Sequence, residues 1–227
     1  MSILDRSTLR DAQTVDYVDS SAISGHKVLR NTYMLLSMTL LFSAITAGVS
    51  IAFALPSMGI IVTLIGYFGL LFLTAKLRNS AWGIASVFAL TGFMGLTLGP
   101  IISRYLGMPG GSGIVMSAMG LTAVIFMGLS AYVLISKRDF SFMGGFLAVG
   151  VLVAFVAGLG AMFFEVPALS IAVSAAFVLL MSGMILFETS NIIRGGETNY
   201  IMATVSLYIT IFNLFTSLLQ ILGFMEK

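Results

Sequence analysis

Long apolar stretches separated by short polar ones dominate the chain after residue 30. Seven of these stretches are close to the roughly 20 residues that an α-helix needs to cross about 30 Å of hydrocarbon. We place the spans at about residues 31–55, 58–76, 81–103, 113–136, 141–164, 168–189 and 201–223. The pattern therefore predicts an all-α integral membrane protein with seven transmembrane helices.

Three prolines affect where the helices of this pattern are expected to end or bend. Pro56 and Pro167 fall in expected turns, where a missing backbone N–H costs least. Pro100 follows Gly99 inside the third span, so we expect a kink or an early end of that helix. Spans one to three and four to six could form inverted repeats beside the seventh, but the residues show no clear self-similarity.

The seventh span carries a polar stripe. Five hydrogen-bonding side chains recur there at alternating spacings of four and three, which places them on one helix face: Ser206, Thr210, Asn213, Ser217 and Gln220. An unpaired polar group in hydrocarbon costs roughly several kcal/mol, so this face should meet other helices or a wet cavity. We expect this helix at the centre of the bundle. The stripe either hydrogen-bonds across helices or lines a water-filled path.

The composition excludes most enzymatic chemistry. The chain is 59% hydrophobic and 9% charged, which excludes a water-soluble domain, and it has no cysteine and one histidine, His26, before the first span. A thiolate site and a His-pair metal site are therefore excluded. The seventh span has no lysine for a retinal Schiff base, and no aspartate lies within an expected span. We expect no enzyme, no cofactor and no nucleic-acid partner.

Lysine and arginine are unevenly distributed over the expected loops. Nine lie on the side of the N-terminus: Arg6, Arg10, Lys27, Arg30, Lys76, Arg78, Lys137, Arg138 and Arg194. Only Arg104 and Lys227 lie on the other side. This bias predicts a cytoplasmic N-terminus and a C-terminus across the membrane. Residues 1–25 are polar with mixed charge, so we expect a disordered cytoplasmic tail before a transmembrane domain of residues 26–227.

Glu188 is the one carboxylate that we expect inside the membrane or at its edge. An ionisable group at that depth usually faces a partner or water, so a proton- or cation-sensitive gate is one interpretation. Its expected partners are Lys76, Arg78 or Arg194. The alternative is a helix-end carboxylate that hydrogen-bonds or reaches the lipid headgroups.

Four runs of residues carry a resemblance that covers all seven spans. They begin at His26-Lys27-Val28-Leu29, at Phe187-Glu188-Thr189-Ser190-Asn191, at Gly195-Gly196-Glu197-Thr198-Asn199 and at Ser206-Leu207-Tyr208-Ile209-Thr210. On these runs the chain resembles the BAX inhibitor-1 family, and within it a bacterial branch of modulators of FtsH protease. The resemblance implies six helices around a central seventh.

The resemblance also implies two functions. The wider family is linked to a pH-sensitive calcium leak attributed to two aspartates, which match Glu188 and Thr210 here. Because Thr210 has no carboxylate, that pair is broken and the leak is disfavoured. The bacterial branch restrains the ATP-dependent protease FtsH in the inner membrane, together with its HflK/HflC partners. We therefore expect a non-enzymatic regulator of FtsH, surrounded by membrane lipids, with a cation or proton leak as the alternative.

Overall fold

The computed structural model describes residues 3–226, and the side chains of residues 26–226. Within that part all regular elements are helices, joined by short turns, and there is no strand. Its elements are α1 (Ile3–Ala52), α2 (Ile60–Leu77), α3 (Trp82–Leu106), α4 (Gly111–Ser136), the short 3-10 helix η1 (Ser141–Met143), α5 (Gly144–Phe163), α6 (Pro167–Ile193) and α7 (Tyr200–Met225). The His26–Ala52 part of α1 and each of α2 to α7 are long and apolar enough to cross a membrane. The predicted fold class is confirmed.

The N-terminal segment is described only in part. Helix α1 is assigned from Ile3, so it includes most of the segment 1–25 in which a disordered tail was expected. Met1, Ser2 and the side chains of residues 1–25 lie outside the described part of the chain. The tail therefore stays a prediction.

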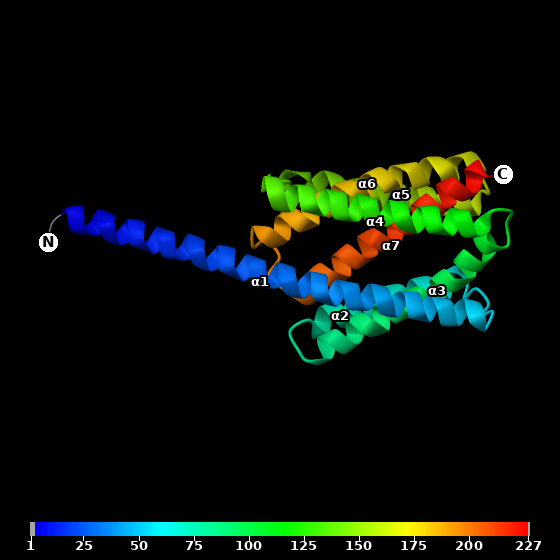
Figure 1. Cartoon of the computed structure of the whole chain (residues 1–227), viewed down its shortest axis with the longest axis horizontal. Helices are drawn as coiled ribbons and strands as arrows, with labels where there is room; N and C mark the ends of the chain where they lie inside the picture. Colours follow the sequence, from blue (N-terminus) through cyan, green and yellow to red (C-terminus); the bar gives the residue numbers. More distant parts are fainter. Residues whose placement is uncertain (1–2, 227) are drawn as a thin grey trace.

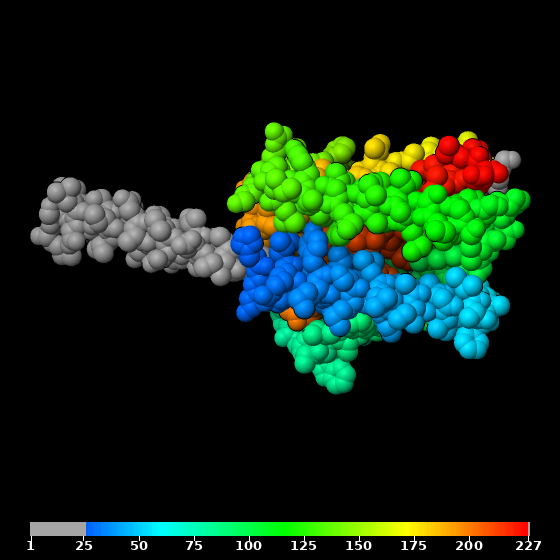
Figure 2. All heavy atoms as spheres, in the orientation of Figure 1, coloured from blue at the N-terminus to red at the C-terminus, as the bar shows by residue number. Residues whose placement is uncertain are grey.

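Helix α7 lies between two groups of helices. Figure 1 shows α1, α2 and α3 on one side of it and α4, α5 and α6 on the other. Helix α7 packs against α1, α3, α4 and α6, while α2 packs mainly on α3 and α5 on α6. Half of the residues in the most apolar stretch of α7 are buried, the largest share among the seven spans of the described residues. On the face shown in Figure 2, α7 is visible between α1 and α4.

Two apolar clusters meet along α7. One joins its first half to α1 and α3 through buried residues such as Leu36, Leu90 and Tyr208. The other joins its second half to α4 and α6 through residues such as Ala118, Ile185 and Leu214. Because α7 contributes to both clusters, its position fixes the two groups of helices relative to each other.

Helix α3 continues through Pro100 to Leu106, so the early end was wrong, and the kink expected as its alternative stays a prediction. Proline has no N–H to donate to the carbonyl one turn earlier, which is that of Leu96. The Ser50 hydroxyl of α1 donates to this carbonyl instead, at 2.9 Å. A hydroxyl from a neighbouring helix thus satisfies the freed backbone oxygen, which is what a proline inside a membrane helix requires.

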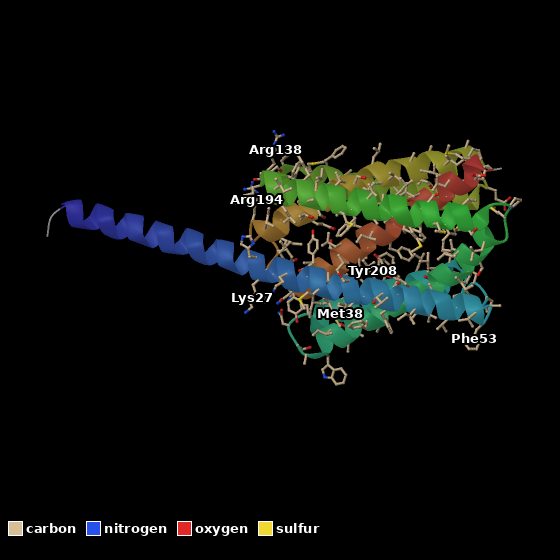
Figure 3. All side chains as sticks on the ribbon, in the orientation of Figure 1. Lys27, Met38, Phe53, Arg138, Arg194 and Tyr208 are labelled. Carbon is tan, nitrogen blue, oxygen red and sulfur yellow. The ribbon has the colours of Figure 1, made fainter. Side chains whose placement is uncertain are left out.

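The two ends of the bundle differ in charge. In Figure 3, Lys27, Arg138 and Arg194 lie at one end and Phe53 at the other. We call the first the basic end; it holds the start of the first span and the turns at residues 78–81, 137–143 and 194–199. The opposite end holds the turns at residues 53–59, 107–110 and 164–166, where Arg104 is near the end of α3.

Candidate functional site: a buried carboxylate between α6 and α7

Glu188 lies near the C-terminal end of α6, and only 6% of its surface is exposed. The hydroxyl of Ser206 donates to its Oε1. The hydroxyl of Thr210 lies 3.1 Å from Oε1 and 3.2 Å from Oε2. Ser206 and Thr210 are one turn apart on α7, so both hydroxyls project from the same helix face. Hydrogen bonds from α7 therefore offset part of the cost of burying this carboxyl group.

Three consecutive buried residues of α6 connect it to three different neighbours. Glu188 contacts α7, and the hydroxyl of Thr189 lies 3.4 Å from that of Ser130 on α4. Ser190 Oγ accepts from the Phe140 N–H at 3.1 Å and donates to the Arg138 carbonyl at 3.3 Å. Successive helical residues point about 100° apart, so one short run can face all three neighbours. The end of α6 is thereby attached to α7, α4 and the α4–α5 turn.

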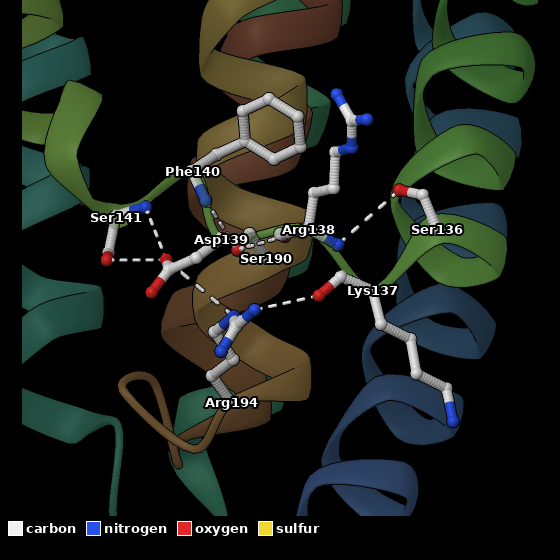
Figure 4. Close-up of polar contacts among 8 residues, drawn as sticks. All are labelled: Ser136, Lys137, Arg138, Asp139, Phe140, Ser141, Ser190 and Arg194. Carbon is white, nitrogen blue, oxygen red and sulfur yellow. Dashed lines mark hydrogen bonds and ion pairs between the residues drawn. The ribbon is translucent and has the colours of Figure 1, made fainter.

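Arg194 completes this attachment at the basic end, as Figure 4 shows. Its Nη2 donates to the Lys137 carbonyl at 2.7 Å, and its Nε lies 3.6 Å from Asp139 Oδ1. The same Asp139 oxygen accepts from the Ser141 N–H at 2.9 Å and from its hydroxyl at 2.6 Å. The Ser141 side-chain and backbone hydrogen bonds, and then the nearby Arg194 charge, lower the pKa of Asp139.

The structure does not pair Glu188 with its expected cations. Among the described residues, the one ion pair within 4.0 Å is that of Arg194 with Asp139. Lys76 and Arg78 are exposed at the basic end, and the Arg78 carbonyl accepts from Asn199 Nδ2 at 3.1 Å. The groups in contact at the site are one carboxyl group and two hydroxyls, with no cation among them. A gate that pairs Glu188 with Lys76, Arg78 or Arg194 therefore stays a prediction.

The other members of the polar stripe have different surroundings. Asn213 donates from Nδ2 to the Ile209 carbonyl of its own helix at 2.9 Å. Gln220 Oε1 accepts from the Ser174 hydroxyl of α6 at 2.9 Å. Ser217 is 7% exposed. The stripe thus hydrogen-bonds to α6 at both ends, at Glu188 and at Ser174, while a water-filled path along it stays a prediction.

Two polar contacts near this site were not predicted from the sequence. Tyr208, on another face of α7, has its hydroxyl 2.6 Å from that of Ser43 on α1 and donates to the Thr91 carbonyl of α3 at 3.2 Å. No sequence signal separates this tyrosine from the apolar residues beside it. The Asp139–Ser141 turn did have a signal, because an aspartate two residues before a serine is typical of a side-chain-stabilised turn.

The chain is similar to one family model and to several known proteins. The family model described as inhibitor of apoptosis-promoting Bax1 matches residues 25–227. The chain is 55% identical over 208 residues to the Escherichia coli K12 protein named modulator of FtsH protease YccA, covering 92% of this chain and 94% of that protein. An equally similar protein of Escherichia coli O6:H1 is named inner membrane protein YccA. An uncharacterized protein of Pseudomonas aeruginosa is 54% identical, covering 93% of this chain and 97% of that protein.

The family match covers all seven spans and the site between α6 and α7. It includes Glu188, Ser206 and Thr210, and it also includes the turns of the basic end. The expected resemblance is confirmed, and the chain belongs to the BAX inhibitor-1 family.

Proposed function

We propose that this chain is a non-enzymatic regulator of the inner membrane that binds FtsH and restrains its proteolytic activity. The observation that carries the proposal is the 55% identity, over 92% of the chain, to a protein named modulator of FtsH protease. The second relative's name, inner membrane protein, supports the membrane location. We extend the proposal to the HflK/HflC partners of the protease, and to a cytoplasmic N-terminus and a periplasmic C-terminus.

The charge of the two ends supports this orientation. The basic end holds Lys27, Arg30, Lys76, Arg78, Lys137, Arg138 and Arg194. Loops rich in lysine and arginine stay on the cytoplasmic side of a membrane. Residues 1–25 precede the first span at that end, where an ATP-driven protease could grip them. The chain would then occupy the protease through this tail.

Hydrogen bonds between its helices would make the bundle resist extraction from the membrane by the protease. Hydrogen bonds join α7 to α1 through Tyr208 and Ser43, and to α6 through Thr210 and Glu188. Near its other end, Gln220 joins α7 to Ser174 of α6. Pulling α1 away would expose polar groups to hydrocarbon, where each unpaired group costs roughly several kcal/mol. A tail on a bundle that resists unfolding would hold the protease without rapid degradation of the regulator.

Co-purification from native membranes in mild detergent tests the proposal. We expect FtsH to be retained by the tagged full chain and lost after deletion of residues 2–24. A protein recovered without FtsH would contradict binding. Inhibition of FtsH that persists after the deletion would contradict the tail as the point of attachment, while leaving binding itself supported.

A cation or proton leak at Glu188 is the second candidate. The observation that favours it is a buried carboxyl group that faces Ser206 and Thr210 and has no ion pair within the described residues. If the leak is the main function, Glu188→Gln abolishes pH-dependent flux in liposomes and the matched change Glu165→Gln, in the exposed α5–α6 turn, does not. Under the regulator proposal, Glu188→Gln leaves FtsH binding nearly unchanged.

A further inference from the structure

We propose that a cavity between the two groups of helices binds one acyl chain of a membrane phospholipid. The cavity has a volume of about 740 Å³ and opens at the surface of the bundle, where the lining residues Phe68 and Leu152 are more than half exposed. Residues of α2 and α3 line one side of it, α5 and Phe177 of α6 line the other, and Ile209, Phe212 and Asn213 of α7 contribute to its wall. Figure 1 shows the two groups of helices with α7 between them. Ligand pockets in proteins typically have volumes of about 300–1,000 Å³.

The lining is unsuited to water. Most lining side chains are apolar, among them Phe68, Phe93, Leu152 and Phe155. A buried water needs about two to four polar partners. A cavity with this lining at membrane depth is therefore suited to an apolar occupant.

Three of the polar lining side chains already donate to the backbone. Thr63 donates to the Gly59 carbonyl at 2.8 Å, and Thr97 donates to the Met94 carbonyl at 2.7 Å. The Asn213 amide donates to its own helix at 2.9 Å. These donors are therefore not free to hold a polar ligand, and the chemistry of the lining favours a hydrocarbon chain.

The position of the cavity matches one leaflet of the bilayer. Its lining begins at the α1–α2 turn, with Ser57 and Gly59, and reaches Asn213 near the middle of α7. Along α2 it runs from Ile60 to Phe68, a distance of about 12 Å at 1.5 Å per residue. Half of the hydrocarbon thickness is about 15 Å. An acyl chain that enters beside the α1–α2 turn, in the leaflet on that side, therefore has the required length.

A transmembrane helix of a partner or of a second copy does not fit. The lining runs about 12 Å along α2, which corresponds to about eight residues of a helix at 1.5 Å per residue. A spanning helix needs about 20 residues. An acyl chain is thinner, flexible and always available within the bilayer, so it is the occupant that the dimensions favour.

A photocrosslinking experiment tests this proposal. The full chain is placed in nanodiscs of phosphatidylethanolamine and phosphatidylglycerol that contain a phospholipid with a diazirine in one acyl chain. Ala148→Phe on α5 fills the cavity, and Ala123→Phe adds the same side chain to an exposed position of α4 outside it. We expect crosslinks on the lining segments of α2 and α5, reduced at least about tenfold by Ala148→Phe and unchanged by Ala123→Phe.

A second readout distinguishes the loss of lipid binding from the misfolding of a variant. Native mass spectrometry after transfer to detergent should find one retained phospholipid on the wild type and on Ala123→Phe, and none on Ala148→Phe or on a second filling variant, Leu152→Trp. Lipid should raise the melting temperature only of the chains that retain it. Equal retention in all four chains would overturn the proposal. So would a lipid-free wild type, or a dimer that Ala148→Phe alone dissociates, since a second copy would then be the occupant.

Discussion

The hydroxyl of Thr210 lies within hydrogen-bonding distance of both carboxylate oxygens of Glu188, at 3.1 and 3.2 Å. These are the two positions at which the family resemblance implies a pair of aspartates. Here a hydroxyl replaces the second carboxyl group, so a hydrogen bond replaces the repulsion that two carboxylates sharing a proton would have. The two positions are in contact in this chain as well, and the contact joins α6 to α7.

The Glu188–Thr210 contact should be measurable as an interaction energy. We expect a double-mutant cycle of Glu188→Leu and Thr210→Val to give a coupling of about 0.6–1.7 kcal/mol in the free energy of unfolding, which runs from the average to the maximum for hydrogen bonds between membrane helices. Thr216→Val is the matched control, because Thr216 donates to the Phe212 carbonyl of its own helix at 3.0 Å. Coupling as large with Thr216 as with Thr210 would contradict a specific contact.

The close approach of α1 and α3 depends on Gly95. A Cβ at this position would collide with the Ser43 backbone carbonyl and the Thr46 hydroxyl. Gly95→Ala should therefore lower the free energy of unfolding by about 1–3 kcal/mol, because backbone atoms must move to relieve the overlap. Gly69→Ala is the control, since nothing lies within 4 Å of its added Cβ. Equal stability of the two variants in a thermal unfolding assay would contradict this packing.

The α4–α5 turn should contribute to stability in a pH-dependent way through Asp139. Its pKa is lowered by the Ser141 hydrogen bonds and by Arg194, so the ionised form is favoured in the folded chain. The contribution is therefore present above the usual aspartate pKa of about 3.9 and is lost as the pH falls through the lower folded value. Asp139→Asn should lower the melting temperature at pH 7 and have a smaller effect at a pH below the lowered folded pKa of Asp139. The same difference at both pH values would contradict the assignment.

Arg194 should protect the same turn from proteolysis. Its contacts with the Lys137 carbonyl and Asp139 hold a turn that contains two trypsin sites, at Lys137 and Arg138. Both side chains of the ion pair are about half exposed, so its loss should change the overall stability little and raise the cleavage rate about two- to fivefold. Arg104→Ala, near the opposite end, should leave that rate unchanged. A rate unaffected by Arg194→Ala would show that Ser190 alone holds the turn.

The helices could be predicted from the sequence because each apolar run matches the thickness of a membrane. The seventh span was expected at 201–223 and is Tyr200–Met225 in the structure. The effect of Pro100 could not be predicted in the same way. Whether a proline ends a helix depends on a donor for the freed carbonyl, and Ser50 lies about fifty residues away in the chain.

The residues of the candidate site could be predicted from the sequence, but the contacts between them could not. Periodicity placed Ser206 and Thr210 on one face of their helix, and depth singled out Glu188. Their contact depends on how α6 and α7 are rotated about their axes, which the spacing within one helix does not determine. The expected partner Arg194 follows Glu188 closely in sequence, yet it lies past the end of α6 and binds Asp139 instead.

The most direct test of the regulator proposal is the rate at which purified FtsH degrades a membrane-protein substrate in proteoliposomes, with and without this chain. We expect degradation to slow as the full chain is added, while the rate of ATP hydrolysis in the absence of substrate shows that the protease remains active. Degradation that stays equally fast at a molar excess of the chain would contradict the proposal that this protein restrains FtsH.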